Sequence, residues 1–351
     1  RNEDGELAPH LKTGRPPAGR DDGRVRQHLD HVVLPQGLQE AEEGPQGREQ
    51  ARPAGRRQVN GGGDEEGPQV GRLEATRIAA PGRLPGLLPS LSEEAALESA
   101  AIRSVAGLGF DLGNWRQPPF RSPHHSASAA ALVGGGTVPR PGEISLSHEG
   151  VLFLDELPEF DRRVLEALRE PLENGRITIS RAGRQAEFPA RFQLVAAMNP
   201  CPCGYHGHPQ KPCRCTAEQI DRYRNRISGP VMDRIDIQVE VPALPAREFT
   251  AIEGSRVSSA DLRKRVMAAR SCQFTRQGKL NCRMQPQDIE QHCALSVARQ
   301  QLLLQAIDRL NLSHRAFHRT LKLARTIADL DNSKELDNRH LMEALSLRRM
   351  H

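Results

Sequence analysis

The chain has 351 residues, enough for two or three domains, and carries a net charge of +5 with a pI of about 9.0. This basic balance permits an acidic polymer as partner, but an aromatic content of 3% excludes stacking on bases as the main mode of binding. No run of eighteen apolar residues is present, which excludes a membrane-spanning helix. Seven cysteines, four of them in one cluster, favour a cytoplasmic protein with reduced thiols or a metal over a disulfide framework.

Residues 1–82 differ from the rest of the chain. They are rich in Arg, Gly, Pro, Gln, Glu and Asp, lack Phe, Tyr, Trp, Cys, Met and Ser, and have almost no periodic apolar pattern. This composition predicts disorder. A wrong reading frame is the second interpretation, because most of the absent residue types have codons that begin with U, as do all stop codons. Both interpretations stay open. Arg1 in place of Met further indicates that the natural start is missing.

From Arg83 onward the composition is typical of a folded protein. Ser92, followed by an acidic first turn, predicts the N-cap of a helix that runs through Ile102. The glycine triplet 134–136 is not a phosphate loop, because no Lys-Ser or Lys-Thr follows it. We interpret it as a turn that leads into a short strand at 142–147. His124 and His125 lack a spaced third ligand, so we interpret them as polar loop or interface residues.

The segment Val151–Leu154 is a continuous apolar run that ends in Asp155 and Glu156. Four apolar residues rich in β-formers predict a strand buried on both faces, as in a parallel sheet. Carboxylates at the end of such a strand lie where open α/β sheets bind ligands. Taken alone, the pair fits either a strand that ends in a polar turn or a Walker B element. In a Walker B element, the first acid holds Mg²⁺ and the second orients the attacking water.

A helix and a hairpin follow. From Asp161 the apolar spacing of three and four predicts an amphipathic helix that ends at Asn174-Gly175. Residues 176–188 then alternate between apolar and polar around a central Ala-Gly pair, which predicts a β-hairpin. Arg181 and Arg184 lie at its tip. They suit contacts to a DNA phosphate backbone, and the alternative is a solvated turn.

Two polar residues adjoin further strands. Asn199 directly follows a second buried strand, 192–198, where an Asn beside Walker B can orient the lytic water. Arg234 lies just before an alternating segment, where an arginine can reach the nucleotide of a neighbouring subunit. The alternative for Arg234, in so basic a region, is an ordinary surface charge.

The cysteine cluster consists of two Cys-x-Cys pairs separated by nine residues. Four thiolates in two pairs suit tetrahedral Zn²⁺. Because Cys-x-Cys is less usual than Cys-x-x-Cys, reduced thiols in a loop remain the alternative, and His206 and His208 are alternate ligands. The four predicted ligands are Cys201, Cys203, Cys213 and Cys215.

Residues 246–351 have helical periodicity throughout, which predicts an all-α domain. One apolar stripe surrounds residues 302–310, a second covers 321–330, and a third predicts a short last helix at 341–347. Ser313 is a plausible N-cap of the second helix. Arg315, in the first turn of that helix, is unfavourable for the helix dipole, and a nearby anion would explain it.

Taken together, these features resemble those of an AAA+ ATPase. The amino-acid sequences of the motifs resemble those of the magnesium-chelatase-like AAA+ ATPases of the YifB/ComM type. The resemblance runs from Arg83 to the C-terminus. Its motifs are Pro123-His-His-Ser-Ala-Ser128, Gly150-Val-Leu-Phe-Leu-Asp-Glu-Leu-Pro-Glu-Phe160, Ala197-Met-Asn-Pro-Cys-Pro-Cys-Gly204, Gly229-Pro-Val-Met-Asp-Arg-Ile-Asp236 and Leu321-Lys-Leu-Ala-Arg-Thr-Ile-Ala-Asp-Leu330.

The resemblance implies an AAA+ P-loop NTPase core at 83–245, with a parallel sheet flanked by helices, and a helical lid at 246–351. It implies ATP and Mg²⁺ as cofactors, a hexameric ring, DNA as partner and, for the ComM type, a branch-migration helicase. Asp155 and Glu156 would then be Walker B, with Asp155 holding Mg²⁺. Asn199 would be sensor 1, Arg234 the arginine finger and Arg315 sensor 2, near the nucleotide. Arg181 and Arg184 would lie on the pre-sensor-1 hairpin.

One departure is large. The family's Gly-x-x-x-x-Gly-Lys-[Ser/Thr] loop occurs nowhere in the chain, and Val70–Gly82 stands in its place. Without its lysine and cradle of N–H groups, we expect ATP binding to be impaired. Two other functions stay open: a chelatase-like remodeller of a protein partner, and a non-enzymatic, zinc-bearing interaction fragment.

Overall fold

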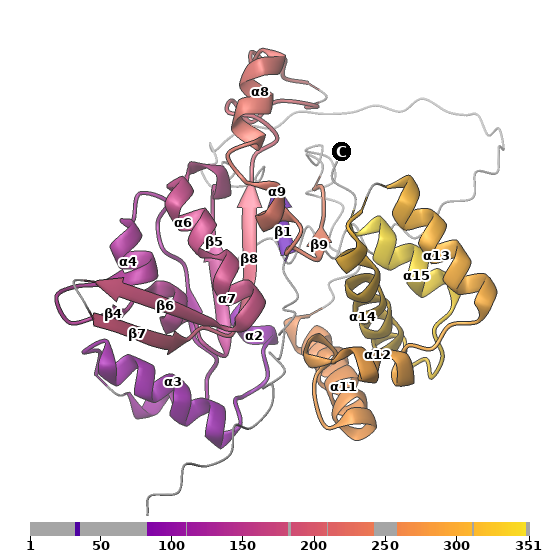
Figure 1. Ribbon diagram of the computed structural model, residues 1–351, viewed down its shortest axis with the longest axis horizontal. Coiled ribbons are helices and arrows are strands. Elements are labelled where there is room, and N and C mark those ends of the chain that lie inside the picture. The colour runs from indigo at the N-terminus through magenta and orange to yellow at the C-terminus, as the bar shows by residue number, and fades with distance from the viewer. Residues whose placement is uncertain are drawn as a thin grey trace, which may run out of the picture.

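The computed structural model describes residues 32–35, 83–109, 111–181, 184–208, 210–241, 258–310 and 312–348. This part of the chain forms a core built on a parallel sheet, up to residue 241, and a helical body from residue 258 onward (Figure 1). The predicted α/β core followed by an all-α lid is thereby confirmed. The predicted boundary at residues 245 and 246 lies outside the described residues. Within them, no helix has both the length and the apolar character needed to cross a bilayer.

The core sheet has five strands in the order β2-β5-β8-β1-β9, and all neighbouring pairs are parallel. Its middle pair, β5 (Gly150–Leu154) and β8 (Phe192–Met198), carries the two predicted buried strands. β5 is buried along its whole length, and β8 at all but one position, which explains their continuous apolar sequences. The outer strands are short: β2 (Phe120–Arg121), β1 (Val32–Pro35) and β9 (Ile237–Gln238).

β1 lies in the segment for which the sequence predicts no regular element. It pairs with β8 from Val32 opposite Val195 to Pro35 opposite Met198, and its other edge pairs with β9. Two adjacent valines make this run a good strand former, and Pro35 stands at its end, where a missing N–H disturbs the ladder least. The rest of residues 1–82 lies outside the described part, where disorder and a wrong reading frame both stay predictions.

The two faces of the sheet differ in the size of the core they bury. Leu152 and Leu154 point to one face and the alternate residues, Val151 and Phe153, to the other. The first face packs against the helices α4 (Ala129–Val133), α6 (Arg162–Ala167), α7 (Arg169–Asn174) and α8 (Ala217–Arg224). On the second face a smaller cluster forms, with side chains of α2 (Leu84–Leu87) packed against it. The main core therefore lies between the sheet and the helices of the first face.

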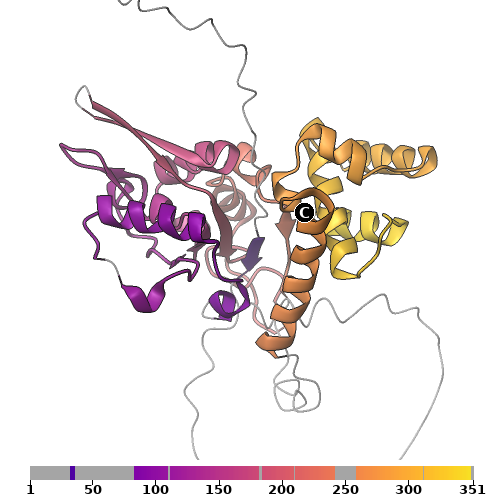
Figure 2. The ribbon, with the colours of Figure 1, turned by 90° about the horizontal axis from the view of Figure 1, so that it is seen from below.

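Most predicted elements of the core are confirmed. Ser92 caps α3 (Glu93–Val105), and Asp161 caps α6, which passes into α7 through Leu168. The hairpin consists of β6 (Arg176–Arg181) and β7 (Arg184–Pro189). Figure 2 shows it as an arm that projects from the core. The remaining short elements of the core are η2 (Leu112–Asn114), β3 (Gly134–Gly135), β4 (Arg140–Pro141), η3 (Leu157–Glu159) and α9 (Gly229–Met232).

The strand predicted at 142–147 is wrong. This segment forms the helix α5 (Glu143–Leu146), in which the Leu146 N–H donates to the Gly142 carbonyl at 2.9 Å. Ile144, Ser145 and Leu146 are all buried, so the alternation of apolar and polar residues does not mark an inner and an outer face here. In addition, the outer edge of β5 is already paired with β2.

The helical body has its own apolar core, centred on α14 (His314–Leu330). Leu321, Leu323, Ala324 and Ala328 of this helix are buried in it, which confirms the predicted stripe. Leu303 and Ile307 join from the predicted stripe before it, and Leu341 and Leu345 from the last helix. The other helices are α11 (Ser259–Gln277), η5 (Asn281–Arg283), α12 (Pro286–His292), α13 (Val297–Arg309) and α15 (Asn338–Ser346).

Candidate functional site

The acidic pair lies at the carboxyl edge of the sheet, directly after β5. The chain turns sharply there, because Glu156 has a left-handed backbone with φ of 52° and its N–H donates to Oδ1 of Asp155 at 3.0 Å. The next residue, Leu157, is fully buried and anchors the turn. Both carboxylates therefore leave the strand at a fixed point at the end of the sheet.

Glu156 has a partner that the sequence interpretation missed. Nδ1 of His125 lies 2.7 Å from Oε2 of Glu156, and both side chains are about one-third exposed, at 34% and 37%. The His125 ring lies against that of His124, with centroids 4.1 Å apart, and His124 in turn bonds the Ser126 hydroxyl at 2.7 Å. The adjacent histidines therefore position the second acid of the pair.

Asn199 follows β8 at the same edge. Since Leu154 lies opposite Ala196 in the β5–β8 register, the residues after both strands leave the sheet side by side. Tyr223 of α8 bonds the Asn199 backbone, and burial raises the pKa of this tyrosine to about 12, helped by the nearby Glu159 and Glu156. The structure thus brings together the predicted Asp155, Glu156 and Asn199.

Arg234 and Arg315 lie elsewhere, where core and lid meet. Arg234, 7% exposed, donates to a carboxylate oxygen of Glu173 and to the Pro230 carbonyl, and desolvation lowers the pKa of its guanidinium. Arg315, with a side chain 65% exposed, lies 3.4 Å from the same Glu173 oxygen. This carboxylate is the anion expected near the first turn of α14. Ser313 occupies the predicted N-cap position, though its side chain makes no capping bond.

Both arginines line a small pocket of about 40 Å³, too small for a nucleotide. Beneath it, Asp236 pairs with Arg319, and with Arg348 at 2.9 Å. Arg319 also donates to the Arg234 carbonyl at 2.5 Å. Asp236, Arg319 and Arg348 are all buried, so this ion network fastens the lid to the start of β9.

The acids with Asn199 and the two arginines lie at opposite edges of the sheet. Arg234 precedes β9 and so lies at the amino edge, whereas Asp155 and Asn199 follow their strands. Glu173 lies near the amino edge too, because Gly175 accepts a hydrogen bond from Ala190, just before β8, at 2.8 Å. β9 begins level with Val195, midway along β8, so Arg234 lies before the start of its own strand while the acids lie beyond the end of theirs. A single chain therefore keeps its acids and its arginines apart.

The predicted DNA-contacting arginines end the two strands of the hairpin. Arg181 lies opposite Arg184 in the register, and the residues between them are outside the described part. Arg184 is exposed, while Ile177 and Ile179 anchor the inner half of β6 in the core. The hairpin thus has an apolar base and a basic tip.

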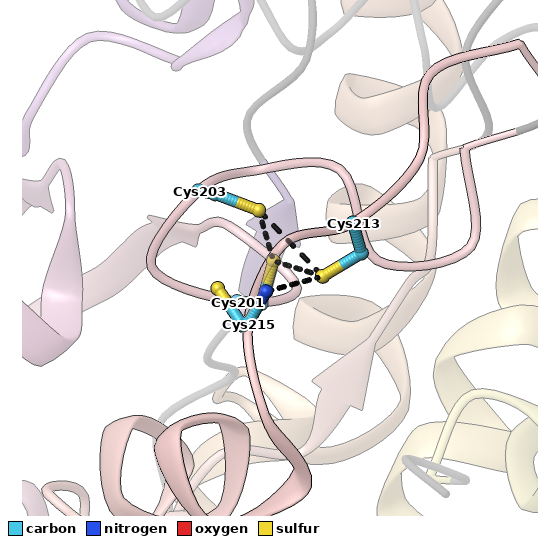
Figure 3. Close-up of side chains that lie close together, drawn as sticks. All are labelled: Cys201, Cys203, Cys213 and Cys215. Atoms are coloured by element: carbon cyan, nitrogen blue, oxygen red, sulfur yellow. Dashed lines mark hydrogen bonds between the residues drawn. The ribbon is translucent and has the colours of Figure 1, made fainter.

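The four predicted cysteines converge in one loop between β8 and α8 (Figure 3). Their sulfur atoms all lie within 4.8 Å of one another. Backbone N–H groups, first that of Arg214, lower the pKa of the Cys203 thiol to about 6, while desolvation and the neighbouring thiols raise the pKa of Cys215 to about 12. Of the alternate ligands, His208 accepts the N–H groups of Gln210 and Lys211 instead.

Two family models match the chain: magnesium chelatase, subunit ChlI, over residues 75–249, and magnesium chelatase, subunit ChlI C-terminal, over residues 256–348. The chain belongs to the magnesium-chelatase-like family. It is 50% identical over 268 residues to competence protein ComM of Haemophilus influenzae and 54% identical over 267 residues to the uncharacterized protein YifB of Escherichia coli. Each alignment covers 76% of this chain and 52% of the relative.

This magnesium-chelatase-like chain thus spans about half the length of the curated relatives it matches. The matched region starts at residue 75, near the point where the resemblance was expected to begin. Within it, sequence reasoning located the acids, Asn199, the arginines and the cysteines. It did not find Glu173, for which no motif offers a signal. For His125 and Asp236 the signal was present, since both stand in segments that carry the family resemblance.

Proposed function

We propose that this chain supplies the hydrolytic edge and the lid of an AAA+ ATPase that drives DNA branch migration, as a helicase of the ComM type. The observation that carries the proposal is the meeting of Asp155, Glu156 and Asn199 at the carboxyl edge of one parallel sheet. The name of the Haemophilus relative, a competence protein, supports a role in the same process.

Each residue at this edge has a separate task. Asp155 offers the hard oxygen ligand that Mg²⁺ prefers and would hold the ion beside the phosphates of ATP. Glu156 would orient the attacking water, in a position set by its contact with His125. The Asn199 amide would align the same water from the neighbouring strand. When bound, Mg²⁺ would neutralise charge that develops on the transferred phosphoryl group.

The separation of the arginines from the acids supports an arrangement of subunits in a ring. Arg234 precedes β9 and meets Arg315 at Glu173, whereas the acids of the same chain follow β5. In a closed ring, the amino edge of one subunit would face the carboxyl edge of the next, and both arginines would reach the neighbour's nucleotide. A hexamer is the number that the family resemblance implies.

We expect this chain to bind ATP poorly, because its sequence has no Gly-x-x-x-x-Gly-Lys-[Ser/Thr] loop. The test compares the full chain with a loop-bearing variant, in which such a loop is joined at Arg83. We expect ATP turnover in the loop-bearing variant, stimulated by branched DNA, and none in the full chain. Turnover by the full chain with ordinary affinity for ATP would contradict the expected impairment.

The same experiment separates the proposal from its alternatives. A chelatase-like remodeller, favoured by the descriptions of both family models, would hydrolyse ATP without stimulation by any form of DNA. A non-enzymatic interaction fragment would be inactive even with the loop. The predicted Zn²⁺ takes no part in this chemistry, because a site closed by four sulfurs has no open position. None of the seven cysteines forms a disulfide, which supports a cytoplasmic location.

The hairpin arginines are the proposed DNA contacts. Replacing both Arg181 and Arg184 with Ala should weaken DNA binding for all sequences and reduce the slope of log K against log salt by about 1 for each arginine. Arg176→Ala is the matched control, since Arg176 lies at the base of the same hairpin in an exposed ion pair with Glu187 at 2.6 Å. Equal salt slopes for the double variant and the unaltered chain would refute the contact.

A further inference from the structure

The cysteine loop has the geometry of a metal site. Sγ of Cys201 lies 3.4 Å from that of Cys203 and 3.7 Å from that of Cys213, and Cys203 and Cys213 are 3.6 Å apart. A tetrahedral Zn²⁺ with bonds of about 2.3 Å to sulfur places its ligands about 3.8 Å from one another. A disulfide, in contrast, requires about 2.05 Å between sulfurs. The cluster is therefore close to the size of a zinc tetrahedron and too open for a disulfide.

Backbone N–H groups donate to two sulfur atoms of the cluster. The N–H groups of Arg214 and Tyr205 point to Cys203, and the Cys215 N–H donates to Sγ of Cys213 at 3.4 Å. Gly204, with φ of +78°, turns the chain directly after Cys203, a conformation that residues with a Cβ rarely adopt. Such N–H contacts orient thiolate ligands and stabilise their charge around a cation.

The cluster also lies between two functional elements. Cys201 is two residues after Asn199, and Cys215 directly precedes Thr216, which caps α8 in a capping box. From α8 the chain returns to the same place, because Tyr223 bonds the Asn199 backbone and Nε of Arg224 donates to the Pro200 carbonyl at 3.3 Å. The cysteine loop thus connects the end of β8 to α8, and α8 packs back against the backbone at Asn199 and Pro200.

We propose that Cys201, Cys203, Cys213 and Cys215 bind one structural Zn²⁺, which clasps the end of β8 to the start of α8 and thereby positions Asn199. Four sulfur ligands satisfy the ion completely, as in structural zinc sites. The binding of zinc does not depend on the proposed ATPase function; only the consequence for catalysis rests on it. A failure of either can therefore be recognised separately.

The first test is the metal content of the full chain, purified without added metal and measured by mass spectrometry. We expect one zinc per chain. Replacing Cys213 and Cys215 with Ser together should reduce it to near zero, while Cys272→Ser, at an exposed cysteine outside the cluster, should retain it. Near-zero metal in the unaltered chain would overturn the proposal, and so would iron in place of zinc or full zinc content in the double variant.

A second measurement avoids variants that fail to fold. Titration of the unaltered chain with an organomercurial should release its zinc in proportion to the modification of four thiols, as followed with a metal-binding dye. Trypsin should then cut the metal-free chain faster at Arg214, which is exposed in the cysteine loop, with no change at Lys264 of α11. Release of zinc without modification of these cysteines would place the ion elsewhere and overturn the site.

The positioning of Asn199 has its own readout. The chain contains two tyrosines, Tyr205 in the cysteine loop and Tyr223 against Asn199. In the fluorine NMR spectrum of a chain labelled with fluorotyrosine, removal of zinc should shift both resonances. A shift of the Tyr205 resonance alone would show that the metal orders only its own loop and would overturn the positioning role.

Discussion

The carboxyl and amino edges of the same sheet hold their charged groups in different ways. At the carboxyl edge, Glu156 is more than one-third exposed, and among the described residues its one ion-pair contact is with His125. At the amino edge, Arg234 is buried and shares Glu173 with Arg315, above the buried network of Asp236. The open edge suits groups that must meet a nucleotide and water. The buried edge suits groups that must also fasten the lid to the core.

The largest effect on ATP turnover should come from Arg234, which the proposed ring would bring to the nucleotide of the neighbouring subunit. In the loop-bearing variant, Arg234→Ala should reduce ATP turnover about 10³-fold or more, as for an arginine finger. Its cost in stability should be small, because Glu173 keeps Arg315 at 3.4 Å. Turnover and urea unfolding of the same samples check both expectations. Arg226→Ala, in the exposed ion pair with Glu159, is the control and should leave turnover unchanged.

Mixing two inactive variants tests whether the edges meet between subunits. Chains with Arg234→Ala retain Glu156, and chains with Glu156→Gln retain Arg234. A mixed ring therefore contains some interfaces with both residues intact, and turnover should reappear on mixing. If the mixture stays inactive while each variant still forms rings, the arginine does not act on the neighbouring subunit.

The buried network should dominate stability. Asp236→Ala leaves Arg319 and Arg348 buried without their shared carboxylate, and we expect the free energy of unfolding to fall by about 3–5 kcal/mol. Urea denaturation followed by circular dichroism measures this change. Glu187→Ala removes the exposed pair with Arg176 and should cost less than about 1 kcal/mol. Equal costs for the two variants would contradict the stabilising role assigned to the buried network.

The exposed acid should matter for chemistry and little for stability. Glu156→Gln in the loop-bearing variant should reduce turnover about 10²- to 10³-fold while ATP still binds, because the amide cannot accept a proton from water. Single-turnover assays and nucleotide binding check this result. Glu159→Gln, three residues further along and paired with Arg226, should retain turnover. Unchanged turnover in Glu156→Gln would refute its assignment.

The smallest effect concerns pH and a buried histidine near the amino edge. Nδ1 of His148 accepts the Arg191 N–H at 3.0 Å, and its Nε2 lies 3.0 Å from Glu98. The ring is buried, and because desolvation disfavours the charged form, the pKa of His148 is lowered below 6.5. As pH falls below 6.5, the unfolded chain takes up a proton before the folded chain does. Stability is therefore lost toward acid pH, by at most about 1.4 kcal/mol per pH unit.

His148→Gln removes this titration. Its unfolding free energy should fall less steeply than that of the unaltered chain just below pH 6.5, as measured by urea denaturation at several pH values. The pKa of Glu98 is also lowered: its bonds with His148 and Arg191 outweigh its desolvation. Its contribution is therefore lost only below pH 4.5, and the two windows can be told apart. Parallel curves from pH 6.5 to 4.5 would contradict the assignment to His148.

Sequence patterns correctly predicted the elements whose formation depends on residues that are close together in the chain. The apolar runs of β5 and β8, the alternation of the hairpin and the helical stripe of α14 each reflect backbone hydrogen bonding and burial within a few residues. The same logic fails at α5, where burial on all sides removes the information in the pattern. It also fails at β1, where four apolar residues fill a position between β8 and β9 that only the sheet defines.

The sequence by itself determined the type of most elements, the acidic pair, Asn199 and the two cysteine pairs, because each depends on residues close together in the chain. Only the tertiary structure decided which charges meet. Glu173 is 61 residues from Arg234 and 142 from Arg315, and no local pattern encodes such a contact. The order and direction of the strands set these distances, since a parallel sheet places the residues after each strand at one edge and the residues before it at the other.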